Sequence, residues 1–238
     1  MTVITDKIYA VIPARSGSKS MKDKNTQMLG KHPLIVHSIL AAQNTPEIDR
    51  VIVSTDSEDY KKIALGFKAE VPFLRPKCIS GDDNTDIEWV AHLLNWLMVN
   101  ERELPEYLVH LRPTSPLRNT QYIRKAIACI KNYPEATALR SIVEMPQSVY
   151  KHFESDGRFL KMVCSGSFDL DSANQPRHLY PTTYDANGYV DILKTRFILD
   201  SGKKKIHGNK VLAFLVPAIT DIDSEKDLEF ARWEIKNA

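Results

Sequence analysis

The stretch Ile8-Tyr9-Ala10-Val11-Ile12-Pro13-Ala14-Arg15-Ser16-Gly17-Ser18-Lys19, with Lys24-Asn25 shortly after it, decides the fold of this chain. Its first five residues are apolar and predict a buried strand, which breaks at Pro13 into a loop of small and cationic residues. In an open α/β sheet such a loop lies at the carboxyl end of a strand and presents N–H groups and positive charge to a polyphosphate. We therefore expect Arg15, Lys19 and Lys24 to bind a nucleoside triphosphate.

The same residues would also suit a solvated basic loop after an edge strand, and composition alone gives the two interpretations about equal weight. Known phosphate-binding signatures do not separate them. The chain has neither the pattern G-x-x-x-x-G-K-S/T nor the pattern G-x-G-x-x-G at this loop, so it is not a Walker A loop or a dinucleotide fingerprint.

Length and composition describe an ordinary globular protein. The 238 residues suit a single domain, 1–238, and the hydrophobic content of 43% and charged content of 26% are typical values. A net charge of +2 with no RNA-binding or zinc-finger signature argues against a nucleic-acid partner. The start of the chain does not resemble a signal peptide, and no apolar run is long enough to span a membrane, so we expect a cytoplasmic protein with no membrane contact. The three separated cysteines are expected to be reduced thiols.

Strands and helices alternate through the first two-thirds of the chain. Thr85 and Glu88 have the spacing of a capping box, and Asp56 or Ser57 can cap an earlier helix. Periodicity predicts helix 33–44, strand 51–54, a helix ending at 67, helix 85–100, strand 108–111 and helix 120–132. This order predicts an α/β fold: a doubly wound, mostly parallel sheet with helices on both faces.

The alternation breaks after about residue 136. Strand-like pieces at 138–143, 149–153 and 159–162 adjoin a polar tract, 165–175, and regular structure returns with strand 188–193, a short helix at 194–200, strand 211–216 and a helix from about 224. We interpret about 141–183 as a small, β-rich excursion from the main sheet. It is too small to bury a core of its own, so we expect it to pack against a second subunit of a homodimer.

Several segments together carry a resemblance to a known family. The loop from Pro13 to Lys19 with Lys24-Asn25 resembles the nucleotide-binding loop of the acylneuraminate cytidylyltransferases, or CMP-sialic acid synthetases. Further blocks look like that family's in the same order: Val53-Ser54-Thr55-Asp56-Ser57, Phe73-Leu74-Arg75-Pro76, Arg112-Pro113-Thr114-Ser115-Pro116-Leu117-Arg118 and Asp221-Ile222-Asp223-Ser224, with weaker matches at Gln175-Pro176-Arg177 and Asn187-Gly188. The resemblance covers nearly the whole chain. It implies a fold of the nucleotide-diphospho-sugar transferase type and transfer of CMP from CTP to the anomeric hydroxyl of a 2-keto-3-deoxy sugar acid, with release of pyrophosphate.

The resemblance also implies roles for individual residues. The cations Arg15, Lys19 and Lys24 would be catalytic, because they hold negative charge on the departing pyrophosphate and the α-phosphate. Nucleotide binding would involve Ala14, Arg15, Ser18, Lys19, Asn25, Arg75 and Thr85, with the backbone near Ala14, Asn25, Arg75 and the segment 82–85 around the cytosine. Arg75 could instead only brace its loop. Arg118 could be a helix-entry charge as easily as a ligand, and we leave it out of the site.

Asp221 and Asp223 are the predicted metal ligands. They stand two residues apart after the last strand, so in an extended segment both carboxylates would face one side, as ligands of Mg²⁺ or Mn²⁺ should. The alternative is that Asp223 only caps the last helix, and the two roles can coexist.

The sugar would be bound by Arg112, Arg177, Asp185, Asn187 and Asp191, with Arg177 near the carboxylate of the sugar acid. Three of these depart from the family pattern: Arg112 stands where Gln is usual, Asp185 where a basic residue is usual, and Asp191 where an aromatic residue is usual. Two added carboxylates would suit free hydroxyls or an amine in place of an N-acetyl group, so we expect N-acetylneuraminic acid to be a poor substrate.

Two alternatives stay open. One is a cytidylyltransferase for an eight-carbon, Kdo-like 2-keto-3-deoxy acid or a different nucleotide. The other is a non-catalytic nucleotide-binding relative, against which the acidic pair Asp221 and Asp223 argues, since a pure binder has little use for a metal at the α-phosphate. His37, His92 and His110 lie in apolar surroundings and are expected to be core or boundary residues, not catalysts.

Overall fold

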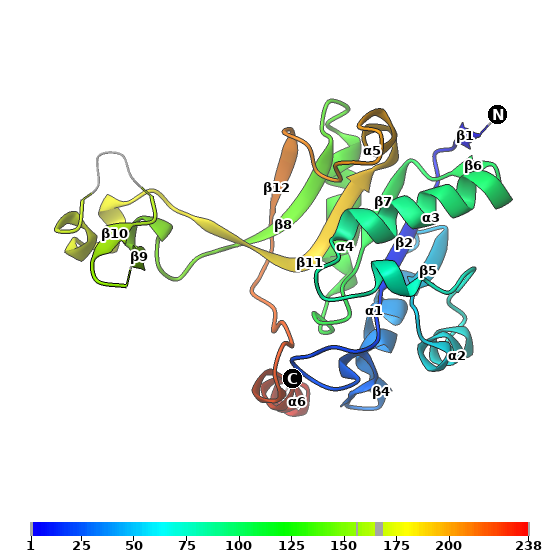
Figure 1. Cartoon of the computed structure of the whole chain (residues 1–238), viewed down its shortest axis with the longest axis horizontal. Helices are drawn as coiled ribbons and strands as arrows, with labels where there is room; N and C mark the ends of the chain where they lie inside the picture. Colours follow the sequence, from blue (N-terminus) through cyan, green and yellow to red (C-terminus); the bar gives the residue numbers. More distant parts are fainter. Residues whose placement is uncertain (1, 156, 165–168, 238) are drawn as a thin grey trace.

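A six-stranded sheet forms the centre of the computed structural model, which describes residues 2–155, 157–164 and 169–237 (Figure 1). Its strand order is β12-β8-β11-β7-β2-β5, in which β11 is antiparallel to both neighbours and the other pairs are parallel. The predicted mostly parallel sheet is thus confirmed. Its strands are β2 (Ile8–Pro13), β5 (Arg50–Ser54), β7 (Tyr107–His110), β8 (Ala138–Glu144), β11 (Tyr184–Lys194) and β12 (Val211–Leu215).

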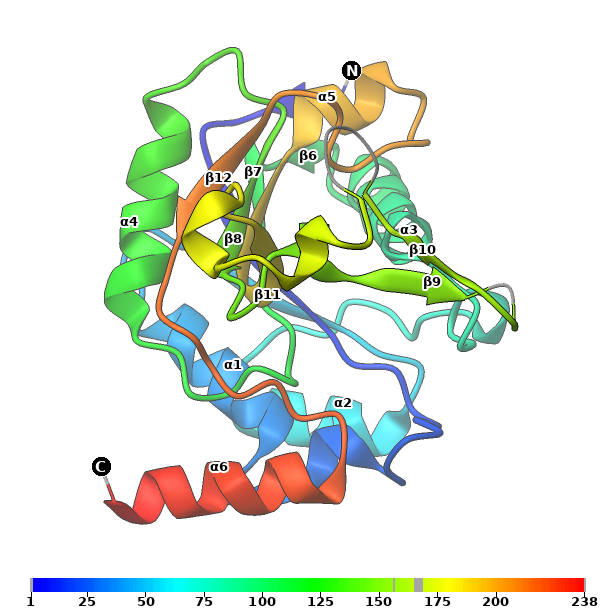
Figure 2. The same ribbon diagram turned by 90° about the vertical axis from the view of Figure 1, so that its left-hand side faces the viewer.

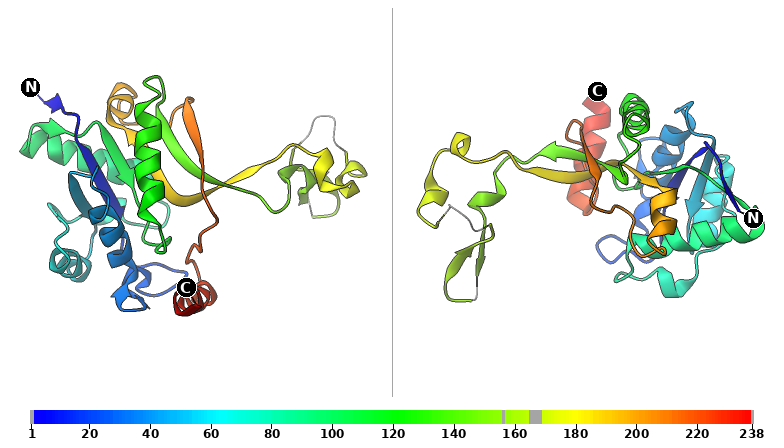
Figure 3. Two further views of the ribbon diagram at one scale, coloured as in Figure 1. Left: turned by 180° about the vertical axis from the view of Figure 1, so that it is seen from behind. Right: turned by 90° about the horizontal axis from the view of Figure 1, so that it is seen from above.

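Helices cover both faces of this sheet, as predicted (Figures 2 and 3). On one face, α1 (Leu34–Gln43), α2 (Glu58–Gly66) and α4 (Thr120–Lys131) contribute buried side chains to one core cluster with the strands. On the other face, α3 (Asp86–Asn100) and α5 (Thr195–Asp200) contribute to a second cluster. Two hydrophobic cores therefore hold the sheet from both sides.

The polar residues at the helix starts act as the sequence predicts. Ser57 caps α2, because its Oγ accepts a hydrogen bond from the Tyr60 N–H at 3.3 Å. Thr85 and Glu88 form the capping box of α3. The last helix, α6 (Glu225–Asn237), follows Ser224, whose N–H donates to Asp227 Oδ2 at 2.8 Å. These bonds satisfy N–H groups that a helix leaves unpaired at its first turn.

An arm formed by residues 145–183 projects from the body on a ribbon made by β8 and β11 (Figures 1 and 3). It holds a short antiparallel hairpin, β9 (Phe153–Ser155) with β10 (Leu160–Met162), and the 3₁₀ turns η3 (Val149–Lys151), η4 (Ser172–Asn174) and η5 (Arg177–Leu179). The arm corresponds to the predicted excursion, although residues 165–168 of its polar tract lie outside the described residues.

The predicted strand over 149–153 is wrong for its first part, where the chain forms the 3₁₀ turn η3. The Lys151 N–H donates to the Ser148 carbonyl at 2.9 Å, and the Val149 N–H donates to Thr183 Oγ1 at 3.1 Å. These local acceptors replace a strand partner, so a β-rich composition does not produce a strand here. The remaining small elements are the two-residue pairs β1 (Val3–Ile4) with β6 (Glu103–Leu104) and β3 (Met28–Leu29) with β4 (His32–Pro33), and the turns η1 (Lys24–Thr26) and η2 (Lys77–Ile79).

A bulge in β11 marks the point where the arm joins the sheet. The pairing of β11 with β8 shifts register between Ala186 and Asp191. Gly188 lies in this bulge with φ of +66°, which favours glycine, and a Cβ there would be crowded at 3.2 Å from Ser115 Oγ. Arg118 fixes the bulge by donating to the Tyr189 carbonyl at 2.5 Å and the Gly188 carbonyl at 3.0 Å.

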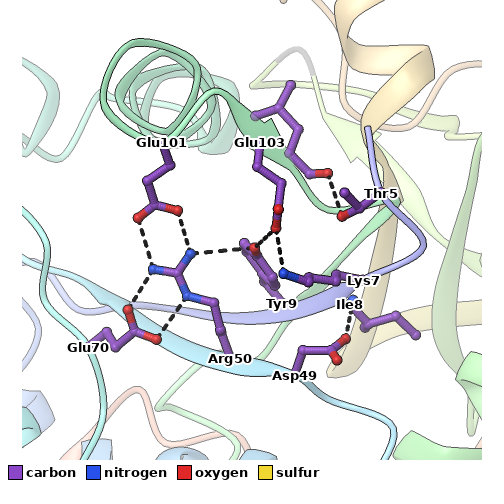
Figure 4. Close-up of polar contacts among 10 residues, drawn as sticks. Thr5, Lys7, Ile8, Tyr9, Asp49, Arg50, Glu70, Glu101 and Glu103 are labelled. Carbon is purple, nitrogen blue, oxygen red and sulfur yellow. Dashed lines mark hydrogen bonds and ion pairs between the residues drawn. The ribbon is translucent and has the colours of Figure 1, made fainter. Parts of the chain in front are cut away.

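A polar cluster connects the starts of β2 and β5, at the edge of the sheet opposite to the carboxyl ends of these strands (Figure 4). Arg50, at the start of β5, binds Glu70 (Nη2 to Oε2, 2.6 Å) and Glu101 (Nη1 to Oε2, 2.6 Å). Its guanidinium also lies over the Tyr9 ring at 4.8 Å, and the Tyr9 hydroxyl donates to Glu103 at 3.1 Å. Because Arg50 binds one carboxylate after α2 and another at the end of α3, it connects segments on both faces of the sheet.

Two smaller predictions also bear on the fold. Cys78, Cys129 and Cys164 are all free thiols, as expected. Within the described ranges, none of the helices has the length and apolar composition needed to cross a bilayer.

We expect Arg50→Met to lower the free energy of unfolding by about 1–3 kcal/mol, because it leaves Glu70 and Glu101 without their shared partner. Urea denaturation followed by circular dichroism measures this effect. Lys62→Met is the matched control, since Lys62 forms only an exposed pair with Asp59 at 3.3 Å and should change stability by a few tenths of a kcal/mol at most. Equal midpoints for the two variants would contradict the role given to Arg50.

Candidate active site

A cavity of about 220 Å³ lies at the carboxyl end of β2. The chain passes from β2 first to β5 on one side and later to β7 on the other, so β2 is a topological switch point, where open α/β sheets bind ligands. The residues that line the cavity come from several separate segments in the first half of the chain. It is lined by Pro13, Arg15, Ser18, Lys24, Asn25, Arg75, Ile79, Gly81, Asn84, Thr85, Asp86, Trp89, Arg112, Pro113 and Thr114.

Asp56 and Ser54 hold the cationic loop against the end of the sheet. The Ala14 N–H donates to the Ser54 carbonyl at 2.9 Å, which continues the pairing of β2 with β5 into the loop. The Ser16 N–H and hydroxyl donate to the two carboxylate oxygens of Asp56, each at 2.7 Å. The sequence indicated Asp56 as a possible helix cap and as part of a block that resembles the family, but not as an anchor of the loop. Its position directly after a buried strand was the available signal for a loop anchor.

The cations of the loop already bind a carboxylate of the protein. Arg15 and Lys19 both form ion pairs with Asp82, the lysine Nζ at 2.7 Å from Oδ2. Hydrogen bonds from Lys19 and Arg15 lower the pKa of Asp82 below its usual value, so it is ionised at neutral pH. Lys19 is otherwise exposed and does not line the cavity, whereas Arg15 does. The sequence placed the segment 82–85 near a ligand but did not single out Asp82.

Of the residues predicted around the base, Asn25, Arg75 and Thr85 line the same cavity, whereas Ala14 is fully buried and does not line it. The Asn25 amide donates to the Arg15 carbonyl at 3.1 Å. Arg75 is only 5% exposed and donates to the Ser54 carbonyl at 2.6 Å and to its hydroxyl at 3.1 Å. Burial lowers the pKa of Arg75 to about 10, so it stays charged at neutral pH. Arg75 therefore braces the end of β5 and also lines the cavity, so the two interpretations of this residue coexist.

Thr85 and Ser18 also line the cavity, but with different surroundings. Thr85 is fixed as the N-cap of α3, so its backbone position is set by the helix. The hydroxyl of Ser18 lies 3.3 Å from that of Ser20 in the exposed part of the loop. Thr85 is thus held by the helix, whereas Ser18 lies in the loop that Asp56 anchors through Ser16.

The acidic pair lies beside the cationic loop. Lys24, which is 8% exposed, donates from Nζ to Asp223 Oδ1 at 2.8 Å. The Ser115 hydroxyl donates to Asp221 Oδ1 at 3.3 Å. Ile222 between them is fully buried while both aspartates are exposed, which fits an extended segment with the carboxylates on one side. Since Ser224 and Asp227 cap α6, Asp223 is not needed as the cap.

Two carboxylates suit a magnesium ion that also binds phosphate. Among the residues that the structure describes, no group of three or more histidine, cysteine or acidic side chains is arranged to hold a metal. Mg²⁺ is commonly bound by one or two carboxylates, with waters and substrate phosphates as its other ligands. Asp221 and Asp223 offer hard oxygen donors of this kind, and Asp223 is 71% exposed at its side chain.

The predicted sugar residues are not gathered in one place. Arg112 lines the cavity, whereas Asp191 is 1% exposed and ion-paired with Arg112 at 2.9 Å. A direct contact between Asp191 and a sugar does not fit this burial, which removes one of the two carboxylates on which the expected preference for a donor-rich group rested. Asp185 is exposed on β11, and the Asn187 amide donates to the Pro217 carbonyl at 3.3 Å.

Arg177 lies on the arm, away from the cavity at β2. It binds Glu144 and donates to the Met145 carbonyl at 3.1 Å, and these three residues line a second cavity with His178 and Tyr180. A contact between Arg177 and a sugar at the first cavity would therefore need a second copy of the chain.

Arg118 and the histidines have structural positions. Arg118 is buried, with 8% of its surface exposed, and this burial lowers its pKa to about 9. Besides the bulge, it binds the Arg112 carbonyl at 2.7 Å and Ser38 Oγ at 3.0 Å, so it positions the start of the Arg112 segment. His110 is 1% exposed and packs edge-on against Trp89, and burial lowers its pKa to about 3. It is neutral at physiological pH, which agrees with its predicted place in the core.

Comparison with known proteins gives a consistent family. A family model described as cytidylyltransferase matches residues 9–195. The CMP-N,N'-diacetyllegionaminic acid synthase of Legionella pneumophila is 29% identical over 96% of this chain and 95% of that protein. The N-acylneuraminate cytidylyltransferase of Escherichia coli O18:K1:H7 is 31% identical over 94% of this chain, which spans 51% of that longer protein. A pseudaminic acid cytidylyltransferase of Campylobacter jejuni is 28% identical over 95% of both chains.

Among solved structures, a CMP:2-keto-3-deoxy-manno-octonic acid synthetase complexed with CTP superposes with a TM-score of 0.72. It is 14% identical and covers 97% of this chain and 99% of that chain. At this sequence identity the structural similarity supports the fold alone. The fold agrees with the predicted nucleotidyltransferase type of α/β sheet.

Asp82→Asn should tighten the binding of inorganic pyrophosphate by about two- to five-fold, because it removes the carboxylate that competes for Arg15 and Lys19, and such partly exposed pairs are worth up to about 1 kcal/mol. Isothermal titration at low ionic strength measures the affinity. Asp83→Asn, which changes the net charge equally at the neighbouring position, is the control and should have a smaller effect. Weaker binding by Asp82→Asn would instead show that Asp82 holds the two cations in their binding geometry.

Proposed function

The chain belongs to the cytidylyltransferase family and is a nucleotidyltransferase; from this premise we propose that it transfers CMP from CTP to the anomeric hydroxyl of a 2-keto-3-deoxy sugar acid of the sialic acid type, a nonulosonate, with release of pyrophosphate. The observation that carries the proposal is the contact between Lys24 and Asp223 at 2.8 Å. It brings the cationic loop and the acidic pair, which lie at opposite ends of the sequence, to one place, as a reaction at a metal-bound phosphate requires.

The loop would serve the triphosphate. Arg15 and Lys19 would exchange Asp82 for phosphate oxygens, while Lys24, buried beside Asp223, would hold charge near the α-phosphate. In the reaction the sugar hydroxyl loses its proton and its oxygen forms a bond to the α-phosphorus. The bond between the α-phosphorus and the oxygen that bridges to the β-phosphate breaks, so negative charge grows on the departing pyrophosphate. Fixed cations that meet this charge lower the barrier, each by about 3 kcal/mol in favourable cases.

The base would lie against residues that hydrogen bonds hold in place. The backbone near Ala14 is paired with β5, Asn25 is hydrogen-bonded to the loop, and Arg75 and Thr85 are held by Ser54 and by the cap of α3. A cytosine has both donor and acceptor edges, and such fixed polar groups can select it over other bases.

Mg²⁺, or Mn²⁺, would bind at Asp221 and Asp223 and neutralise phosphate charge when the nucleotide is present. The chain's own contribution is to hold these carboxylates beside the cationic loop. Lys24 and Ser115 fix one oxygen of each aspartate, and the burial of Ile222 fixes the segment between them.

A sugar acid of the sialic acid type is favoured over the eight-carbon alternative. The relatives with nonulosonate names are 28–31% identical over at least 94% of this chain, whereas the octonic acid synthetase supports only the fold. The sugar would lie against the Arg112 side of the cavity, with Asn187 and Asp185 of β11 at its outer end and Arg177 supplied by a second subunit.

We propose that the arm makes a two-fold homodimer. Large apolar side chains on the arm are exposed, including Phe153 (43%), Leu160 (55%) and Leu179 (53%), and an exposed apolar surface of this kind is typical of an interface. Packing there could also bring Arg177 toward the partner's cavity.

Pyrophosphate release over a grid of the four nucleoside triphosphates and several sugar acids tests the proposed reaction. CTP with a nine-carbon 2-keto-3-deoxy acid should give the highest turnover, and Arg15→Ala should lower kcat by about 100-fold with a smaller change in KM, since the cation serves the transition state. Equal turnover of all four triphosphates would contradict the base pocket. Release with no sugar acid would contradict the reaction.

Removal of the metal gives a separate prediction. Turnover should require Mg²⁺ or Mn²⁺, and Asp223→Asn should lose at least about 100-fold in kcat. The variant should still unfold cooperatively on heating, because the amide oxygen of the asparagine can still accept the hydrogen bond from Lys24. Asp227→Asn weakens the cap of α6 and the hydrogen bond from the Asp223 N–H but keeps both carboxylates of the acidic pair, so it controls for a disturbed helix start. Undiminished activity of Asp223→Asn in EDTA would remove the metal site from this account.

The dimer is tested by light scattering after size exclusion. We expect a particle of twice the chain mass of 27.1 kDa, and Leu160→Glu with Leu179→Glu should shift it toward the monomer. A monomeric wild type at high concentration would mean that the arm is not an interface of this chain with itself.

A further inference from the structure

Two residues that depart from the family pattern contact each other. Arg112 stands where the family usually has Gln, and Asp191 where it usually has an aromatic residue. In the structure Arg112 Nη1 donates to Asp191 Oδ2 at 2.9 Å. The two departures therefore form one ion pair and act together, although they lie far apart in the sequence.

A second carboxylate fixes the other end of the same guanidinium. Arg112 Nη2 donates to Asp86 Oδ2 at 2.8 Å. Asp86 is the first residue of α3, and its other oxygen accepts a hydrogen bond from Trp89 Nε1 at 2.9 Å. With both terminal nitrogens bound to anchored carboxylates, the Arg112 side chain loses little freedom when a ligand arrives.

Asp191 is placed to support Arg112 and not to reach a ligand. It is 1% exposed and lies in β11 between His110 of β7 and Arg140 of β8, whose Nε is 3.6 Å from Asp191 Oδ1. Because burial keeps His110 neutral, the two arginines compensate the charge of Asp191. Burial opposes the charge of Arg112, but Asp191 and Asp86 outweigh it and raise its pKa, so Arg112 is a cation at any working pH.

The exposed part of this cation belongs to the main cavity. Arg112 lines it together with Arg15, Lys24 and Thr114. A guanidinium has five N–H donors and no acceptor, and two of them serve Asp86 and Asp191, so Arg112 can still donate to a ligand. It suits a group that only accepts hydrogen bonds, best a carboxylate, and it disfavours an ammonium group.

The proposed substrate has such a group close to its reacting atom. In a 2-keto sugar acid the carboxylate is attached to the carbon that carries the attacking hydroxyl. When this hydroxyl meets the α-phosphorus, the carboxylate must lie in the same cavity as the phosphate-binding cations. Arg112 meets this condition within one chain, whereas Arg177 lies on the arm beside Glu144.

We propose that Arg112 binds the carboxylate of the sugar acid beside its anomeric centre, and that Asp86 and Asp191 are positioning residues that hold its guanidinium in place. This inference rests on the proposed transfer to a 2-keto sugar acid. It gives the carboxylate to Arg112 instead of Arg177, and it predicts that a free amine near this wall is disfavoured.

The test compares sugar acids with analogues that lack the charge. N-Acetylneuraminic acid, its 5-hydroxy analogue and the 1-carboxamides of both are assayed by pyrophosphate release, with KM for CTP measured in parallel. The wild type should prefer each acid over its amide. Arg112→Gln should lower kcat/KM for the acids by about 10- to 100-fold and lose most of the preference, with KM for CTP changed less than about two-fold.

Asp191→Asn distinguishes positioning from a direct contact. It should produce part of the same loss, and the double variant with Arg112→Gln should be no worse than Arg112→Gln alone, because Asp191 acts through Arg112. If Asp191→Asn proves unstable, Arg112→Lys is the second test. It keeps the cation, so it should retain part of the preference for acid over amide that Arg112→Gln loses. Arg124→Gln, a surface arginine paired with Glu47, is the matched control and should behave as the wild type.

The outcomes separate this inference from the proposed function. If the wild type turns over a sugar acid but Arg112→Gln keeps the full preference for acid over amide, the carboxylate assignment is wrong while the proposed function stands. Additive losses in the double variant would show that Asp191 does not act through Arg112. If no sugar acid is turned over by the wild type, both proposals are overturned.

Discussion

The ion pair between Lys24 and Asp223 is the contact on which the arrangement of the site depends. Lys24 is 8% exposed, and an unpaired ammonium group at that burial would be strongly unfavourable. Its partner comes from the segment before α6, so the end of the chain must lie across the cationic loop. A small core reinforces this arrangement, because Met21 of the loop packs with Leu29, Leu34, Ile222, Leu228 and Ala231. The sheet thus positions the cationic loop, and the packing of α6 positions the acidic pair beside it.

Charge in this site is arranged so that cations meet carboxylates of two kinds. Asp82 is exposed enough to leave Arg15 and Lys19 when phosphate arrives, since partly exposed ion pairs are weak. Asp191 and Asp86 hold Arg112 from the buried side, where loss of one partner leaves an uncompensated charge. The ion pairs of Asp82, which phosphate can replace, therefore lie on the loop. The ion pairs of Arg112, which stay in place, lie on the buried side of the cavity wall. This division fits a site that must release a charged product and still keep its shape.

The sequence predicted the elements with strong periodicity or capping residues. The strand Ile8–Pro13, the helix capped by Thr85 and Glu88, and the alternation of strands and helices all form as expected, because local propensity and burial favour the same structure. The strand predicted at 149–153 failed where Ser148 and Thr183 supply turn hydrogen bonds from outside the window that periodicity reads. The closeness of the loop to Asp223 was implied by family resemblance, and the structure supplies the contact.

The partners of the site residues could not be predicted in this way. Asp82 and Asp86 lie in a polar turn and a helix start whose local pattern explains them fully as solvated and capping residues. From the sequence, Asp191 was expected to face the ligand, because it replaces a residue usual in the family. Only the register of β11 with β7 and β8 shows that it is buried between His110 and Arg140. Such roles depend on which strands become neighbours, and one-dimensional patterns do not contain that information.

A crystal structure of the protein with CTP and Mg²⁺ tests the central claim most directly. The account predicts the triphosphate on the loop after β2, with Arg15 and Lys19 bound to phosphate oxygens in place of Asp82, the metal at Asp221 and Asp223, and the cytosine near Arg75. A nucleotide bound elsewhere, for example in the cavity of the arm beside Arg177, with Asp82 still joined to Arg15 and Lys19, would contradict it.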